Sequence, residues 1–166
     1  TNEFPILIGR PKVVKKLIEK YGLPLEINKN FELVNPESDP RYREYWMTYH
    51  QIMERRGVTP TLARAIMRTN NTVIAAVMVK REEADSVICG TVGQYLWHLK
   101  YIREILADSS LEPLGAISMM LLETGPLFVG DTQIHPQPSA ERISDTVIAA
   151  ARHTRRFGIE PKMDWF

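Results

Sequence analysis

Residues 4–22 read FPILIGRPKVVKKLIEKYG, a short apolar run followed by a polar turn and an amphipathic segment. The run 4–8 predicts a buried strand with a proline near its start. Pro11 suits the first turn of a helix, apolar residues recur on one face, and Gly22 favours the helix end. A strand followed by a helix is the unit from which α/β proteins are built, so this stretch predicts that class.

The same alternation continues along most of the chain. Further strands are predicted at residues 31–34, 86–89, 116–122 and 127–129, and helices at 40–56, from 60, 73–79, 96–106 and from 140 to about 156. Thr59, Asn70 and Ser139 are expected to cap the helices that follow them. The run 73–79 is interpreted as a helix because its apolar residues recur at one and four positions, with a buried strand as the alternative. The pattern predicts an α/β fold, a layered, mostly parallel sheet flanked by helices.

The polar loop at 108–113 is the candidate domain boundary. It divides the chain into residues 1–107, part of a first α/β subdomain, and residues 108–166, the start of a second. The chain begins at Thr1 without a methionine, and we expect it to be a fragment of something longer, with a processed chain as the alternative.

Composition excludes several classes of protein. The 166 residues carry 21 Lys and Arg against 20 Asp and Glu, a net charge of +1, so no strong electrostatic case exists for nucleic acid or an anionic membrane. No apolar run approaches the roughly 20 residues of a membrane-spanning helix. The single cysteine, Cys89, excludes an intrachain disulfide and fits a reducing compartment, so we expect a cytoplasmic location.

A first candidate site is Cys89-Gly90-Thr91-Val92-Gly93, directly after a predicted strand and before a helix. Glycines there would let the backbone approach a ligand, and the helix would offer free amides to a phosphate. The motif matches neither a dinucleotide fingerprint nor a P-loop, and a plain strand-to-helix turn is the alternative. Cys89 could be a nucleophile at a helix N-terminus, or a small turn residue.

A second candidate site is Gly130-Asp131-Thr132, at the end of another predicted strand. An acidic residue there can bind a ligand group, or it can cap backbone amides in a helix-entry loop. The histidines form no zinc-type spacing, and we expect no metal site, including at Asp131 and His135.

Several stretches together resemble the phosphate acetyl/butyryl transferase family, and more narrowly the C-terminal phosphotransacetylase-like domain of bacterial NADP-dependent malic enzymes. The resemblance covers nearly the whole chain, in order. It is carried by residues 5–11 (PILIGRP), 35–42 (NPESDPRY), 55–60 (RRGVTP), 83–93 (EADSVICGTVG), 126–132 (PLFVGDT) and 155–162 (RRFGIEPK).

The resemblance implies a two-subdomain fold, related to isocitrate and isopropylmalate dehydrogenases, that is incomplete in this fragment. It implies a cleft between the subdomains that binds acetyl-CoA or a related metabolite. In this sequence the ligand-binding candidates are Gly90, Thr91 and Gly93 for backbone approach, Lys100 for charge, Tyr95 or His98 for shaping the pocket, and Asp131 and Thr132 on the opposite side. No catalytic residue is assigned, because the groups that act in true transferases lie largely beyond the end of the chain.

Two departures from the family pattern bear on activity. Transferases usually carry a stretch leading to Leu-Arg-Pro, whose arginine contacts substrate, and here Lys100 takes its approximate place within GQYLWHLKY at 93–101. Lysine is a point charge without the two-pronged guanidinium, so the change is not conservative at a phosphate site. The final residues, Met163-Asp164-Trp165-Phe166, also depart from the family pattern.

We therefore expect a regulatory domain that binds acetyl-CoA allosterically and has no transferase activity of its own. The resemblance implies that the bacterial parent converts malate to pyruvate and CO2, with NADP and Mg or Mn held in N-terminal domains and no cofactor in this fragment. One alternative is an active phosphate acetyltransferase that makes acetyl phosphate and CoA. Another is a purely oligomerising module, and in each case we expect a homo-oligomer.

Overall fold

The computed structural model describes residues 4–107, 114–131, 133–135 and 137–162. The chain forms two compact units, Thr1–Leu106 and Ala107–Phe166. The predicted boundary loop at 108–113 lies outside the described residues. Assignment of the two units to subdomains of a larger fold stays a prediction.

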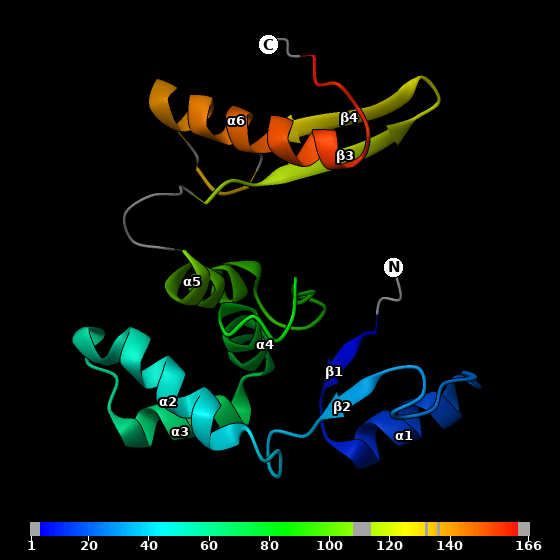
Figure 1. The fold of residues 1–166 in the computed structure, drawn as a ribbon, viewed down its shortest axis with the longest axis vertical. Coiled ribbons are helices and arrows are strands. Elements are labelled where there is room, and N and C mark those ends of the chain that lie inside the picture. The colour runs from blue at the N-terminus through cyan, green and yellow to red at the C-terminus, as the bar shows by residue number, and fades with distance from the viewer. Residues whose placement is uncertain (1–3, 108–113, 132, 136, 163–166) are drawn as a thin grey trace. The chain divides into compact units, whose positions relative to one another are not determined.

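The first unit begins with a strand, a helix and a strand in the predicted order (Figure 1). The prediction that the first strand is buried is wrong, because Leu7 at its centre is 42% exposed. Strand β1 (Ile6–Ile8) and strand β2 (Glu32–Val34) pair in parallel, with Leu7 opposite Leu33. Helix α1 (Pro11–Lys20) connects them, and Pro11 occupies its first turn as expected. Parallel strands require such a crossover connection, so the quoted stretch supplies the first strand and the connecting helix of a β-α-β unit that β2 completes.

Four α-helices and a short 3-10 helix follow in the described part of this unit. They are α2 (Tyr42–Met53), the 3-10 turn Glu54–Arg56, α3 (Pro60–Thr69), α4 (Asn71–Lys80) and α5 (Tyr95–Leu106). Thr59 caps α3 through its hydroxyl, which accepts from the Leu62 amide at 3.2 Å. Asn70 caps α4 by accepting from the amides of Thr72 and Val73. These caps confirm that the threonine and asparagine positions separate the two helices.

Helix α4 lies at the centre of the unit, packed against α2, α3, α5 and β1. Its apolar residues are buried nearly all round the helix, which is why its sequence lacks a polar face. The prediction of a helix rather than a strand at 73–79 is confirmed. The core around it comprises Val34, Tyr45, Tyr49, Met53, Ala63, Met67, Val73, Ile74, Ala76, Val77, Met78 and Ile105.

The second unit is a hairpin and a helix. Strands β3 (Ile117–Leu122) and β4 (Gly125–Gly130) are antiparallel, because the two-residue connection at 123–124 is too short for a parallel crossover. Gly125 has φ +123°, a backbone conformation that favours glycine. Helix α6 (Ala140–Arg156) packs against β4, and Ser139 caps it as predicted by accepting from the Arg142 amide.

The α/β class is therefore confirmed, with small sheets: β1–β2 is parallel and β3–β4 antiparallel. One predicted strand is wrong. Residues 86–89 are not assigned to a strand, and Ile88 is 99% exposed. A strand exists only through hydrogen bonds to a neighbour, and no described strand pairs with this segment. Its apolar run alone did not determine its structure.

The apolar face of α1 is also less buried than its periodicity suggests. Val14 is buried, but Val13, Leu17 and Tyr21 are 46%, 45% and 63% exposed. Val13 and Leu17 line a groove of about 780 Å³ that runs along β1 and α1. Periodicity thus identified the helix correctly without showing what packs on it. Within the described residues, no helix has the length and apolar content to cross a membrane.

Candidate functional site

Residues 84–94, called the glycine segment below, lie between α4 and α5 and contain the predicted glycine site. Gly90 and Gly93 have φ of +105° and +104°, conformations that residues with a side chain rarely adopt. Thr91 between them is exposed. The backbone is therefore bare of side chains at two points just before α5 begins, which is the arrangement expected where a ligand approaches the main chain. Whether a ligand does so stays a prediction.

The His98 side chain holds the C-terminal end of the glycine segment against the core through two hydrogen bonds. It is only 9% exposed, and its Nε2 lies 2.8 Å from the carbonyl oxygen of Val92. Because a carbonyl only accepts, Nε2 carries the hydrogen, and in the neutral ring Nδ1 accepts from the Thr72 hydroxyl at 2.7 Å. Thr72 belongs to the buried first turn of α4. The imidazole therefore bridges the loop and the central helix.

The close packing of His98 explains why residue 93 is glycine. A Cβ built on Gly93 would lie 2.9 Å from His98 Nε2, closer than such atoms approach. A Cβ on Gly90 would meet nothing within 4 Å. The two glycines share a backbone conformation, but only Gly93 is also confined by a neighbouring side chain.

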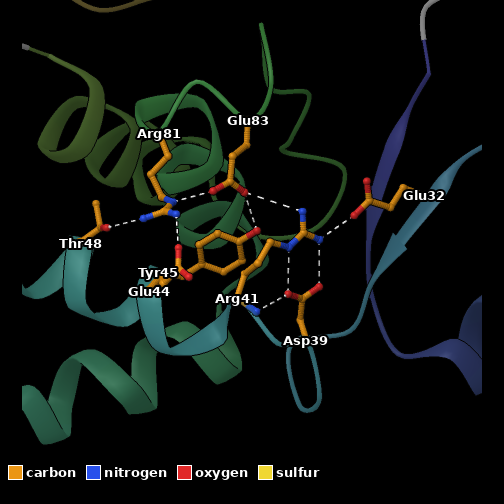
Figure 2. A network of polar contacts seen from close by, with 8 residues as sticks. All are labelled: Glu32, Asp39, Arg41, Glu44, Tyr45, Thr48, Arg81 and Glu83. Atoms are coloured by element: carbon orange, nitrogen blue, oxygen red, sulfur yellow. Dashed lines mark hydrogen bonds and ion pairs between the residues drawn. The ribbon is translucent and has the colours of Figure 1, made fainter.

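A network of polar contacts fastens the other end of the segment (Figure 2). Glu83, just beyond α4, accepts from the Tyr45 hydroxyl at 2.7 Å and from Arg81 Nε at 2.6 Å. Arg81 also donates to Thr48 at 3.3 Å and to Glu44, both on α2. The network therefore joins the C-terminal end of α4 to α2, and residues 84–93 are held at both ends.

A second arginine extends the network to β2. Arg41 donates to both carboxylate oxygens of Asp39, each at 3.0 Å, and to Glu32 at 2.6 Å. Its guanidinium also lies 3.8 Å from Glu83. The Tyr45 ring lies between the two arginines, with their Cζ atoms 5.8 and 5.7 Å from its centroid (Figure 2). Such contacts favour a cation beside an aromatic face.

These contacts shift the pKa values of the groups involved. Burial raises the pKa of the Asp39 carboxyl, but hydrogen bonds from Arg41 outweigh it and hold that pKa below its ordinary value. The pKa of Glu83 is likewise lowered, because hydrogen bonds from Arg81 and Tyr45 outweigh burial. Burial and the bond to Glu83 raise the pKa of Tyr45. The carboxyl groups of Asp39 and Glu83 are therefore ionised at neutral pH and paired with Arg41 and Arg81, while the Tyr45 hydroxyl keeps its proton and donates a hydrogen bond to Glu83.

The other predicted site residues fall into two groups. Tyr95 and Lys100 lie exposed on α5, in the same unit as the glycines and His98. Asp131 lies in the second unit, directly after β4, and Thr132 lies outside the described residues. The position of Asp131 and Thr132 opposite the glycine segment stays a prediction.

Asp131 is held in an unusual conformation. Its φ is +52°, and its side chain is 7% exposed, with Oδ2 lying 2.8 Å from His135 Nδ1. Its Oδ1 is buried and has no hydrogen-bond partner in the described part of the chain. Across those same ranges, no group of three or more His, Cys, Asp or Glu side chains gathers as a metal site. The expected absence of a metal stays a prediction.

Sequence reasoning missed two features. Gln94 and Trp97 line a hollow of about 280 Å³ beside the glycine segment. Trp97 and Lys100 lie three residues apart on α5, a spacing that makes their side chains neighbours, and Gln94 directly precedes that helix. The network around Arg41 and Arg81 gave no comparable signal, because its members are spread from residue 32 to residue 83.

The sequence profile of the phosphate acetyl/butaryl transferase family matches residues 3–165, so the chain belongs to that family. Solved structures agree on the fold. The EutD phosphotransacetylase from Staphylococcus aureus aligns with 95% of this chain and 47% of its own, at a TM-score of 0.77 and 20% identity. A phosphotransacetylase from Streptococcus pyogenes aligns over 96% of this chain and 48% of its own length, with a TM-score of 0.79 and 18% sequence identity.

Curated relatives place the chain more narrowly. It is 46% identical to an NADP-dependent malic enzyme of Escherichia coli, over 96% of this chain and 21% of that protein. It is 45% identical to an NAD-dependent malic enzyme of Rhizobium meliloti, over 95% and 21%. A phosphate acetyltransferase of Synechocystis is 27% identical over 95% and 22%. The chain thus spans about a fifth of these relatives' length, in the malic enzymes their C-terminal part.

Proposed function

We propose that this chain is the phosphotransacetylase-like regulatory domain of an NADP-dependent malic enzyme, and that it binds acetyl-CoA without transferring the acetyl group. The observation that carries the proposal is an identity of 39–46% with four malic enzymes, against 25–27% with three phosphate acetyltransferases. The separation is not complete, since another malic enzyme of Rhizobium meliloti is 24% identical.

The glycine segment supports the choice of ligand. Gly90 and Gly93 leave the backbone accessible next to α5, and the exposed Lys100 supplies a positive charge on that helix. Acetyl-CoA carries several phosphate oxygens, which such a charge attracts. Because residues 84–93 are held by Glu83 at one end and His98 at the other, the backbone is preorganised for binding.

The proposed absence of transferase activity follows from Lys100. Transferases resembling this chain carry arginine at the approximate position, where a planar guanidinium can hold two phosphate oxygens at once. A lysine attracts a phosphate without fixing its orientation, and acetyl transfer from the CoA sulfur to a phosphate oxygen depends on that orientation. Binding would therefore persist while the reaction would not.

The parent, in this proposal, oxidises malate to pyruvate and CO2 with NADP and Mg²⁺ or Mn²⁺ held outside this chain. Acetyl-CoA bound here would inhibit that reaction through contacts within a homo-oligomer in the cytoplasm. The Rhizobium relative is named NAD-dependent, so both nicotinamide cofactors belong in any assay.

The test uses the full-length protein that carries this chain. Malate oxidation is measured with increasing acetyl-CoA for the wild type, for Lys100→Ala and for Lys16→Ala, an exposed lysine on α1 that serves as the control. Inhibition that weakens in Lys100→Ala alone supports the proposal. Equal acetyl-CoA sensitivity in all three proteins, or in a protein lacking residues 1–166, contradicts it.

A transferase assay on the same proteins decides between regulation and catalysis. Acetyl-CoA and inorganic phosphate are supplied, and acetyl phosphate is measured. The proposal predicts no acetyl phosphate above the uncatalysed rate. Sustained formation of acetyl phosphate would instead establish an active phosphate acetyltransferase.

A further inference from the structure

Two exposed arginines of α3 lie against aromatic side chains of α2, the helix packed beside it (Figure 1). The Cζ atom of Arg64 lies 4.3 Å from the centroid of the Trp46 ring. The Cζ atom of Arg68 lies 5.2 Å from the centroid of the Tyr42 ring. The Tyr42 hydroxyl also donates to the backbone carbonyl of Arg64 at 2.7 Å. Both guanidinium groups are therefore held in place on the surface, because an aromatic face attracts a cation.

Arg64 and Arg68, the arginine pair, have no acidic partner in the part of the chain that the structure describes. Neither guanidinium forms an ion pair there. Residues 57–81 contain no Asp or Glu, so α3 and α4 supply no carboxylate to the pair. Arg41 and Arg81, which also lie beside an aromatic ring, are by contrast each paired with carboxylates. The arginine pair thus offers guanidinium N–H donors that a carboxylate from elsewhere can accept.

Helix α6 carries a matching acidic pair, Glu141 and Asp145. These residues are one helical turn apart, as the two arginines are, and side chains at that spacing are neighbours on a helix surface. Within the helices that the structure describes, no other two acidic residues stand at that spacing. Neither carboxylate forms an ion pair with a described residue. Ile148, three residues after Asp145, is 57% exposed and lies on the same helix face.

We propose that α6 of a second copy of this chain docks on the arginine pair, with each carboxylate of the acidic pair bound by one guanidinium. Because the spacings are equal, two helices lying side by side form both ion pairs at once. Each planar guanidinium can donate two parallel hydrogen bonds to its carboxylate. The aromatic contacts already restrain the arginines, so binding orders them at a smaller cost in side-chain entropy. Ile148 adds an apolar contact beside the ion pairs.

The composition of the α2–α3 surface favours a protein partner over a small anion. Arginine, tryptophan and tyrosine are the residue types most enriched where protein surfaces bind each other. The arginine pair lies outside both the groove at α1 and the hollow at Trp97, whereas small ligands bind in concave sites. The contact joins two different surfaces, so each copy offers one surface to each of two contacts. It does not depend on acetyl-CoA binding.

Sedimentation velocity of the full chain, over a range of concentrations, tests the contact by charge reversal. Arg64→Glu combined with Arg68→Glu makes both surfaces acidic, and Glu141→Arg combined with Asp145→Arg makes both surfaces basic. Each double variant should associate at least about a hundredfold more weakly than the wild type, because like charges then face each other. An equimolar mixture of the two double variants should restore association, because every contact between unlike copies again joins opposite charges.

Lys12→Glu combined with Lys16→Glu is the matched control, since it reverses two exposed charges one turn apart on α1. This variant should associate as the wild type does. Association of the wild type should weaken in about 1 M NaCl, where charges are screened within about 3 Å. Circular dichroism checks that each variant is folded. The acidic pair makes no aromatic contact, so its variant tests the proposal even where loss of the arginines unfolds the chain.

Three results would overturn the contact. The first is a wild type that stays monomeric at millimolar concentration. The second is association of both charge-reversed variants at wild-type strength, or a mixture of the two that associates no better than either variant by itself. The third is a loss of folding stability in the charge-reversed variants, at unchanged sedimentation, which would show that the ion pairs form within one copy. Acetyl-CoA binding, measured separately by calorimetry, decides the proposed function in every case.

Discussion

Replacing Gly93 by alanine tests how the glycine segment is held. Gly93 and Gly90 have nearly equal φ, +104° and +105°, so alanine at either position incurs the same kind of backbone strain, about 1–3 kcal/mol. At Gly93 the new Cβ would additionally lie 2.9 Å from His98 Nε2, while at Gly90 it would meet nothing. Gly90→Ala is therefore a matched control that carries the strain without the contact.

The extra cost at Gly93 can be estimated from the contacts of His98. The imidazole must move, and it then loses its hydrogen bonds to Val92 and Thr72, each contributing about 0.5–1.5 kcal/mol. We predict that Gly93→Ala lowers the free energy of unfolding by about 1–3 kcal/mol more than Gly90→Ala. Urea unfolding followed by circular dichroism measures the difference.

The state of the His98 ring provides a second readout of the same prediction. Imidazole nitrogen resonances should show the Nε2–H form in the wild type and in Gly90→Ala, and a disturbed ring in Gly93→Ala. Equal stability of the two variants, with His98 unchanged in both, would refute the reasoning. It would mean that the imidazole does not hold the loop.

Three further outcomes are expected for the polar network and for the end of α4. Tyr45→Phe removes a hydrogen bond to the charged Glu83 and should lower the free energy of unfolding by about 1.5–3 kcal/mol. The control Tyr42→Phe loses an exposed hydrogen bond to a backbone carbonyl and should lower it by about 0.5–1 kcal/mol. Equal urea midpoints for the two variants would contradict this prediction. Glu82 has φ +61° at the end of α4, so Glu82→Gly should raise the free energy of unfolding by about 0.5–1 kcal/mol, and a decrease would refute the assigned strain. The pKa values of Asp39 and Glu83 in the folded protein lie below the ordinary 3.8 and 4.5, so these carboxylates stabilise the fold above the ordinary values. That stabilisation is lost as the pH falls through the folded-state pKa values. The urea concentration at the unfolding midpoint should therefore stay constant from pH 7 to about pH 5 and should decrease once the pH is below about 4.

The sequence predicted local structure best where residues act through their own backbone. Pro11, Thr59 and Asn70 each mark a helix start because proline fixes φ and the polar side chains satisfy free amides nearby. Ser139 does the same for α6. These signals need no knowledge of the rest of the fold, and the structure confirms them.

The failures have a common physical cause, which is dependence on distant partners. The strand expected at 86–89 needs a paired neighbour, and its apolar run carries no information about one. The exposure of Val13 and Leu17 depends on what packs against α1, which periodicity does not specify. The network around Arg41 and Arg81 joins residues that are up to 51 positions apart, from Glu32 to Glu83, so no local sequence motif predicts it.

The candidate site shows the same division. The glycines were identified from the chain because their conformational freedom is a local property. The role of His98 as a bridge to Thr72 depends on a helix that lies 26 residues earlier. The hollow at Trp97 depends on exposure, which a sequence with no partner information does not reveal.

The measurement that tests the central claim most directly is calorimetric titration of the chain with acetyl-CoA, with acetyl phosphate titrated in parallel. We predict saturable binding of acetyl-CoA, without turnover, that becomes about tenfold weaker in Lys100→Ala and is unchanged in Lys16→Ala. The absence of acetyl-CoA binding at millimolar concentration would contradict the claim that this chain carries a regulatory acyl-CoA site.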